Sequence, residues 1–192
     1  MNIKDFEKGK LYEWSEIFEL QKQTNCDFNT VTKEAIEDFD ISYYEDQELF
    51  KRYCWFITEE LTEAVEAERL KEPTHLKEEL IDALNFTIGL YSLYGWNYED
   101  IKTSHIKKQT YKLDSAIFET IVAIGLTANC LKNREWRESQ YLVDLVVFEE
   151  RLHYIWGCFM EAFAQLHMYD KDIRELWGLK YQVNRFRIES KY

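Results

Sequence analysis

The sequence predicts an all-α fold, a bundle of five to six helices forming a single domain over residues 1–192. The chain has only 6 Gly and 1 Pro, so it offers little of the turn chemistry that β-rich folds require. Apolar residues recur at helical spacing over long stretches. At 192 residues with 16% aromatic residues, the chain can bury a sizeable core.

The first predicted helix covers residues 10–24, where Trp14, Ile17 and Phe18 follow the helical spacing. It leads into a polar string that contains Gln21 and Asn25. On spacing alone, these amides fit a frayed, solvated helix end. The alternative is that two amides four residues apart share a face and recognise a base edge by hydrogen bonds. Residues 26–44 are mixed and acidic and indicate a loop with room for a short helix.

Two long helices joined by a tight hinge are expected next. The first runs from about Asp46 to Lys71 and should end there, because the residue before Pro73 disfavours the helical conformation. The second runs from about Thr74 to Tyr94, and residues 80–90 are apolar nearly all round, which indicates a buried helix. So short a hinge makes the pair an antiparallel hairpin.

Shorter and longer helices follow in the second half. Glu99 and Asp100 suit the first turn of a short helix, where negative charge is favourable. Apolar periodicity then predicts three helices, over about Ser115–Cys130, about Gln140–Met168 and about 170–187.

The hairpin carries two acidic motifs. Glu59-Glu60-Leu61-Thr62-Glu63 reads E-E-x-x-E, and Glu79-Leu80-Ile81-Asp82 reads E-x-x-D. Residues three apart share a helix face, so Glu60 pairs with Glu63 and Glu79 with Asp82. Either motif alone is more often a solvated face. Two in succession, the second in a buried helix, favour a Mg²⁺ site, because four convergent carboxylates repel one another and Mg²⁺ bridges carboxylates to phosphates.

Such a site could hydrolyse a nucleotide. Carboxylate-held Mg²⁺ orients phosphates and lowers the pKa of a bound water, and a free carboxylate can take the proton. Lys180, Arg185 and Arg187 are candidates for binding the distal phosphates. Alone they are weak evidence, since cations are expected in a last helical turn.

Composition narrows the possible partners. The net charge of −12 argues against polymeric nucleic acid as a partner, because phosphate contacts need a basic surface. No apolar stretch approaches the 18–20 residues of a membrane helix. The four cysteines are scattered, which fits reduced thiols. We therefore expect a soluble, cytoplasmic protein.

The acidic motifs and their spacing resemble the all-α nucleoside triphosphate pyrophosphohydrolase superfamily, which includes MazG and the dimeric dUTPases. Three other segments look more like the dimeric dUTPase and dCTPase branch. Residues 20–25 (LQKQTN) are similar to L-Q-x-x-x-N, and residues 79–86 (ELIDALNF) resemble E-L-x-D-x-x-H-F. Residues 180–187 (KYQVNRFR), with Tyr192, look like K-N-x-x-N-x-x-R-Q-x-x-G-Y.

The resemblance implies a Mg²⁺-dependent, homodimeric enzyme that hydrolyses dUTP, and as a further candidate dUDP, with dUMP and pyrophosphate as products of dUTP. Glu60 and Glu63 would be catalytic, and Glu60 is our first choice for orienting the attacking water. The implied metal ligands are Glu60, Glu63, Glu79 and Asp82. The implied substrate-binding residues are Gln21 and Asn25 for the base, with Asn85, Lys180, Asn184, Arg187 and Tyr192.

The chain departs from the pattern at several positions. Asn85 stands where His is usual, Tyr181 where Asn is common, and Ile188 and Lys191 replace Gln and Gly. A dCTPase and a broader MazG-like pyrophosphohydrolase therefore remain alternatives. A non-catalytic nucleotide-binding regulatory protein and a purely structural interaction protein are the competing classes.

Overall fold

The computed structural model describes residues 10–103, 112–131 and 143–190, and over these ranges it confirms an all-α fold. Six long helices match the upper number predicted, and the short helices α2 and α5 add to them within the described ranges. The helices are α1 (Trp14–Asp27), α2 (Lys33–Glu37), α3 (Tyr44–Leu70), α4 (Pro73–Leu93), α5 (Tyr98–Ile101), α6 (Leu113–Ala128), α7 (Leu145–Gln165) and α8 (Asp170–Ser190).

Two helix starts differ from the sequence prediction for local reasons. α1 begins at Trp14 rather than residue 10, because Glu13 and Glu16 form a capping box in which the Glu13 backbone N–H donates to Glu16 Oε2 (2.9 Å). α7 begins at Leu145 and is capped by Asp144, which accepts from the Val147 N–H (3.2 Å). The predicted start at Gln140 lies outside the described residues.

The central hairpin is present within two residues of its predicted bounds. α3 ends because Lys71 adopts a left-handed conformation (φ 60°), and the Glu72 N–H then donates to the Ala67 carbonyl (2.9 Å). Pro73 occupies the first turn of α4, where its missing N–H has no consequence. Lys71 therefore ends one helix, and the single proline starts the next.

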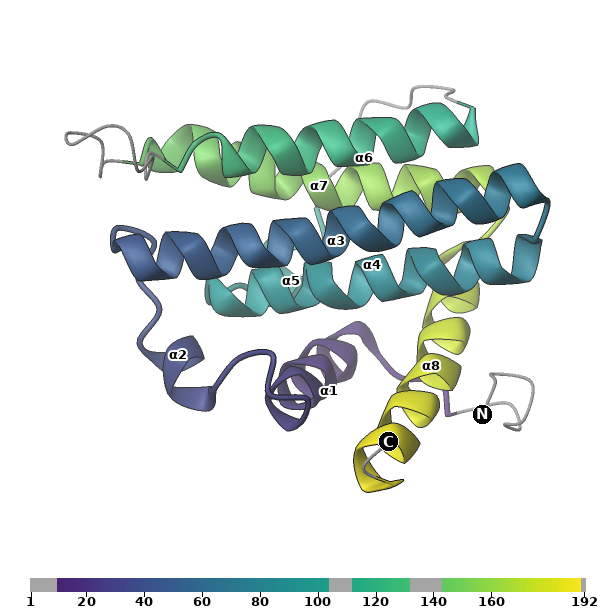
Figure 1. The fold of residues 1–192 in the computed structure, drawn as a ribbon, viewed down its shortest axis with the longest axis horizontal. Coiled ribbons are helices and arrows are strands. Elements are labelled where there is room, and N and C mark those ends of the chain that lie inside the picture. Colours follow the sequence, from purple (N-terminus) through teal and green to yellow (C-terminus); the bar gives the residue numbers. More distant parts are fainter. Residues whose placement is uncertain (1–9, 104–111, 132–142, 191–192) are drawn as a thin grey trace.

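The helices form a layered bundle (Figure 1). α3 and α4 pack along their length, and α6 and α7 form a second pair beside them. α1 and α8 lie on the other side of α4, and each contacts it. α4 thus has the bundle on one side and the α1–α8 layer on the other, which explains why it is apolar nearly all round.

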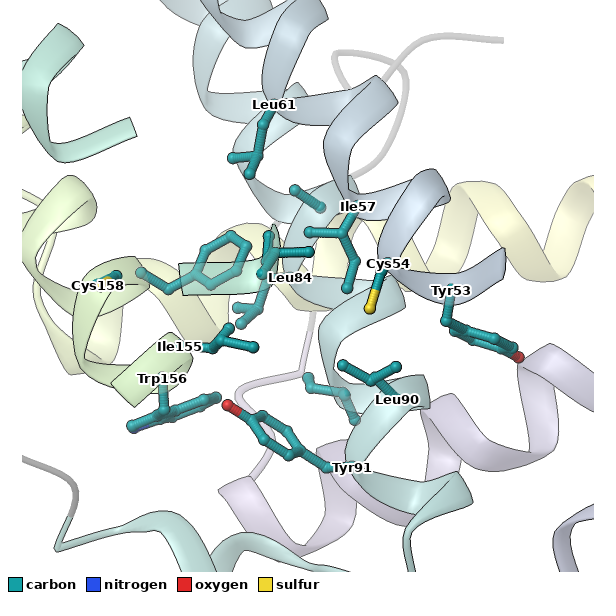
Figure 2. Packing of buried hydrophobic residues seen from close by; sticks show 14 of the residues in the cluster. Tyr53, Cys54, Ile57, Leu61, Leu84, Leu90, Tyr91, Ile155, Trp156 and Cys158 are labelled. Carbon is teal, nitrogen blue, oxygen red and sulfur yellow. The ribbon is translucent and has the colours of Figure 1, made fainter. Parts of the chain in front are cut away.

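The core lies where α3, α4 and α7 meet (Figure 2). Leu61, Leu84 and Ile155 come from these three helices and are fully buried. Tyr91 is buried beside them, and its hydroxyl donates to the Leu152 carbonyl of α7 (3.0 Å). Burial of each large apolar side chain contributes about 1.5–3 kcal/mol. This packing holds the hairpin rigidly.

Two composition-based predictions can be compared with the fold. Cys54, Cys130 and Cys158 are buried and Cys26 is partly buried, all as free thiols. In the described ranges, every helix is too short or too polar to cross a membrane.

Gly89 lets α1 and α3 approach α4 closely. A Cβ at this position would lie 2.6 Å from the Tyr53 ring and even closer to the Asn25 amide. Gly89→Ala should therefore lower the free energy of unfolding by about 1–3 kcal/mol in denaturant titrations. Gly125→Ala is the matched control, because its Cβ would meet nothing within 4 Å and alanine favours the helix by about 0.5–1 kcal/mol. Equal stability changes in the two variants would contradict this packing.

Candidate active site

Three carboxylates converge at the hairpin. One ligand oxygen each from Glu60 on α3 and from Glu79 and Asp82 on α4 lie within 4.8 Å of one another. We call these three residues the carboxylate cluster. Leu61 and Ile81, which follow Glu60 and precede Asp82 in the chain, are fully buried, so core packing fixes the backbone that carries the cluster.

Glu63, the fourth predicted ligand, lies outside this cluster. Its side chain is exposed one turn after Glu60, although it is close enough for its charge to raise the pKa of Glu60. Its role as a ligand or catalytic residue therefore stays a prediction. Glu59 is exposed as well, as expected for a solvated charge.

Two carboxylates of the cluster have a partner with a basic side chain. Lys180, which is 92% buried, forms an ion pair with Asp82. His75 Nδ1 lies 2.9 Å from Glu79 Oε1. The sequence assigned Lys180 to the substrate, whereas in the structure its amine contacts a cluster carboxylate.

Glu60 contacts its fellow carboxylates instead. Burial, followed by the charge of Asp82 and a hydrogen bond with Glu79, raises the pKa of Glu60 from its ordinary 4.5 to about 8. Burial also raises the pKa of Asp82, but Lys180 opposes that rise. At neutral pH, Glu60 therefore holds a proton that a cation could replace.

The cluster fits a hard divalent cation. Its three donors are carboxylate oxygens, the ligands that Mg²⁺ and Ca²⁺ prefer. Oxygens on opposite sides of a Mg²⁺ lie about 4.2 Å apart, since each bond is about 2.1 Å. The three oxygens lie within 4.8 Å of one another, about 0.6 Å more than this distance, so a small movement of the side chains would bring them to one ion. A bound cation would also stabilise the otherwise unfavourable charge.

A pocket of about 320 Å³ opens beside the cluster, between α1, α3, α4 and α8. Its walls combine acidic groups, amides, hydroxyls, two phenyl rings and one guanidinium. The lining residues are Gln21, Thr24, Asn25, Phe28, Thr30, Glu60, Asp82, Asn85, Phe86, Asn184 and Arg187. Glu60 and Asp82 belong to both the cluster and the pocket, so the two form one site.

The amide pair of α1 lies in this pocket. Gln21 and Asn25 are each 4% exposed, and Gln21 Nε2 donates to Asn25 Oδ1 (2.9 Å). The interpretation as a frayed, solvated helix end is therefore wrong. Thr30 anchors the end of α1, because its hydroxyl donates to the Asn25 carbonyl (2.8 Å). Gln21 and Asn25 are buried because α4 packs against this face of α1, whereas Gln23 is exposed.

α8 supplies the opposite wall. Asn184 and Arg187 line the pocket, and the substrate-binding role that the resemblance implied for them stays a prediction. Arg185, which the sequence offered for distal phosphates, instead forms an ion pair with Asp27 and so connects α8 to the end of α1. Tyr192 lies outside the described residues.

Asn85 lies at the junction of the cluster and the pocket. Its Nδ2 is 3.4 Å from Asp82 Oδ1, a long hydrogen bond in which the amide donates. Its Oδ1 is buried and has no hydrogen-bond partner among the described residues. An acceptor left in this state costs about 1–3 kcal/mol, so the site is incomplete without a donor.

Sequence reasoning missed several residues of the site. Phe28 and Thr30 lie in the connection after α1, where no periodic pattern marks them. Phe86 was indistinguishable from core in an apolar helix. His75 did carry a signal, because His and Glu four residues apart on a helix share a face.

The shift at Glu60 makes stability depend on pH. Between its ordinary pKa of 4.5 and about 8, the folded chain keeps a proton that the unfolded chain releases. The unfolding free energy contributed by this group should therefore fall as pH rises through this window. Thermal unfolding from pH 5 to 9 should show that fall, Mg²⁺ should reduce it, and Glu60→Gln should weaken it. A wild-type and Glu60→Gln pair with identical pH profiles would refute the assignment.

One comparison with known proteins gives a match. Residues 25–108 match the family model of phosphoribosyl-ATP pyrophosphohydrolase, which belongs to the MazG-like all-α superfamily. No curated protein and no solved structure matches the chain. The matched segment covers less than half of the chain but contains the whole hairpin and its acidic motifs. The chain is thus similar to nucleotide pyrophosphohydrolases in the segment that carries the carboxylate cluster.

Proposed function

We propose that the protein is a Mg²⁺-dependent nucleoside triphosphate pyrophosphohydrolase with dUTP as its preferred substrate. The observation that carries this proposal is that the carboxylate cluster opens directly into a pocket with amide and aromatic walls. A carboxylate cluster that binds a metal, beside a pocket with aromatic and hydrogen-bonding walls, would suit a ligand with a polyanionic end and a heterocyclic end. The match to a pyrophosphohydrolase family over the hairpin supports the reaction class.

The order of residues along α4 supports an orientation for the substrate. Asp82 belongs to the cluster, Asn85 follows one turn later, and Gly89 is where the Asn25 amide packs. At about 1.5 Å per residue, Asp82 and Gly89 are separated by about 10 Å along the helix. A nucleotide laid along α4 would place its phosphates at Asp82, its sugar near Asn85 and its base between Phe86 and the amide pair.

Different residues of the chain are proposed to bind the metal, orient the water and hold the phosphates. A Mg²⁺ ion held by Glu60, Glu79 and Asp82 would supply positive charge to the phosphates and lower the pKa of a water. Glu60 faces the pocket, and among the described residues it has no basic partner of the kind that Lys180 gives Asp82. It is therefore our choice to orient that water and accept its proton. Arg187 and Asn184 would hold the phosphates beyond the cleavage point between the α and β phosphates.

The same site is compatible with other nucleotide substrates. dCTP, dUDP and a broader set of triphosphates are the alternatives, since the amides of Gln21 and Asn25 could pair with several base edges. We also propose that the protein acts in the cytoplasm as a homodimer. Exposed apolar side chains on α6, among them Phe118 and Leu126, offer a surface for a second copy.

A pyrophosphate-release panel tests the activity and the base choice together. With Mg²⁺, the purified protein should release pyrophosphate from dUTP faster than from dCTP, dTTP and UTP, and EDTA should stop the reaction. Faster turnover of dCTP, or equal rates for all, would favour the two alternative activities. Tight nucleotide binding without any turnover would point to a regulatory protein, and no binding at all would refute the proposal.

Removing the charge of Glu60 should have opposite effects on the activity and on the stability of the protein. Glu60→Gln should lower turnover by about 10²-fold or more while raising the melting temperature above pH 8, because it removes a repelled charge. Glu59→Gln is the matched control, since Glu59 is adjacent but exposed, and it should change neither quantity. Equal turnover in the two variants would exclude Glu60 from catalysis.

A further inference from the structure

His75 contacts one of the cluster residues from outside the pocket. It lies in the first turn of α4, two residues after Pro73, and its Nδ1 is 2.9 Å from Glu79 Oε1. The two side chains differ sharply in exposure, at 49% for His75 and 9% for Glu79. An ordinary surface pair four residues apart has both groups in water and contributes about 0.2–0.5 kcal/mol. Here the Glu79 carboxylate is buried within the site, so its contact with His75 affects how that carboxylate is oriented toward the cluster.

Glu79 has a different neighbour on its other side. It lies against Glu60, with which it forms a hydrogen bond. Its position is therefore set from two directions, by His75 outside and by the cluster inside. A metal-bound carboxylate is ionised and only accepts hydrogen bonds, so in the metal-bound site Nδ1–H of His75 must be the donor.

We propose that His75 is a positioning residue for the metal, which fixes Glu79 so that its remaining oxygen faces Glu60 and Asp82. This inference rests on the proposed function, because it requires the cluster to bind a divalent cation. Groups that donate to metal ligands hold those ligands in orientation, and their loss typically lowers metal affinity 10–100-fold. Lys180 holds Asp82 in the corresponding way from α8. Both α4 carboxylates are then oriented by side chains that do not themselves bind the ion.

Two substitutions of similar shape isolate the hydrogen bond. His75→Asn keeps an N–H donor at the δ position, whereas His75→Leu places carbon there. Both replace a half-exposed side chain, so both variants should fold. Thr74→Ala is a further control on the same turn, where the side chain is exposed.

Calorimetric titration of the full chain with Mg²⁺ alone tests the proposal. The dissociation constant should rise about tenfold in His75→Leu and stay close to the wild-type value in His75→Asn and Thr74→Ala. A merely structural contact would shift the melting temperature of the metal-free protein and leave Mg²⁺ affinity unchanged. Equal Mg²⁺ affinity of His75→Leu and wild type, or equal weakening in His75→Asn and His75→Leu, overturns this inference alone. Failure of the wild type to bind Mg²⁺ overturns the proposed function.

Discussion

The arrangement of the site depends on placing three carboxylates together inside a folded hairpin. One carboxylate oxygen each from Glu60, Glu79 and Asp82 lie within 4.8 Å of one another, and an uncompensated buried charge costs several kcal/mol. When no cation is bound, three features reduce the repulsion between these carboxylates. Lys180 pairs with Asp82, His75 contacts Glu79, and Glu60 keeps its proton. The hairpin tolerates the unfavourable free energy of these carboxylates because its opposite side is packed into the core through residues such as Leu61 and Leu84.

The site lies at the boundary between two layers that differ in packing. α3 and α4 pack along their length and hold the cluster, whereas α1 and α8 contact α4 less extensively and contribute the amides and Arg187. The proposed metal ligands therefore come from the more extensively packed layer, and the proposed substrate contacts come largely from the other layer. Arg185 and Asp27 join the two outer helices to each other. This division suits a site whose metal geometry must stay fixed while a ligand enters beside it.

The sequence allowed much of this to be predicted, for identifiable reasons. Pro73 located the hairpin turn, and the three-residue spacing placed Glu79 and Asp82 on one face. Spacing could not distinguish Glu60 from Glu63, because the way α3 rotates against α4 decides which of the two faces inward. Nor could it show that Gln21 and Asn25 are buried, since the covering surface comes from α4, far along the chain. Packing between helices that are distant in the sequence thus determines which glutamate faces inward and which amides are buried, and the local sequence pattern does not show this.

In the proposed enzyme, the choice of base depends on which polar side chains of the pocket can rotate. The amides of Gln21 and Asn25 are bonded to each other, and turning both reverses donor and acceptor without losing that bond. The pair can therefore present either order, one suited to uracil and the other to cytosine. The Asn85 amide has one fixed orientation. Its Nδ2 must face the Asp82 carboxylate, because an ionised carboxylate can accept hydrogen bonds but cannot donate them. The Asn85 Oδ1 is therefore left as the buried acceptor. In the proposed enzyme, the fixed contacts to the nucleotide then come from groups such as Asn85 beside the sugar, which is one of the positions at which this chain departs from the motif it resembles.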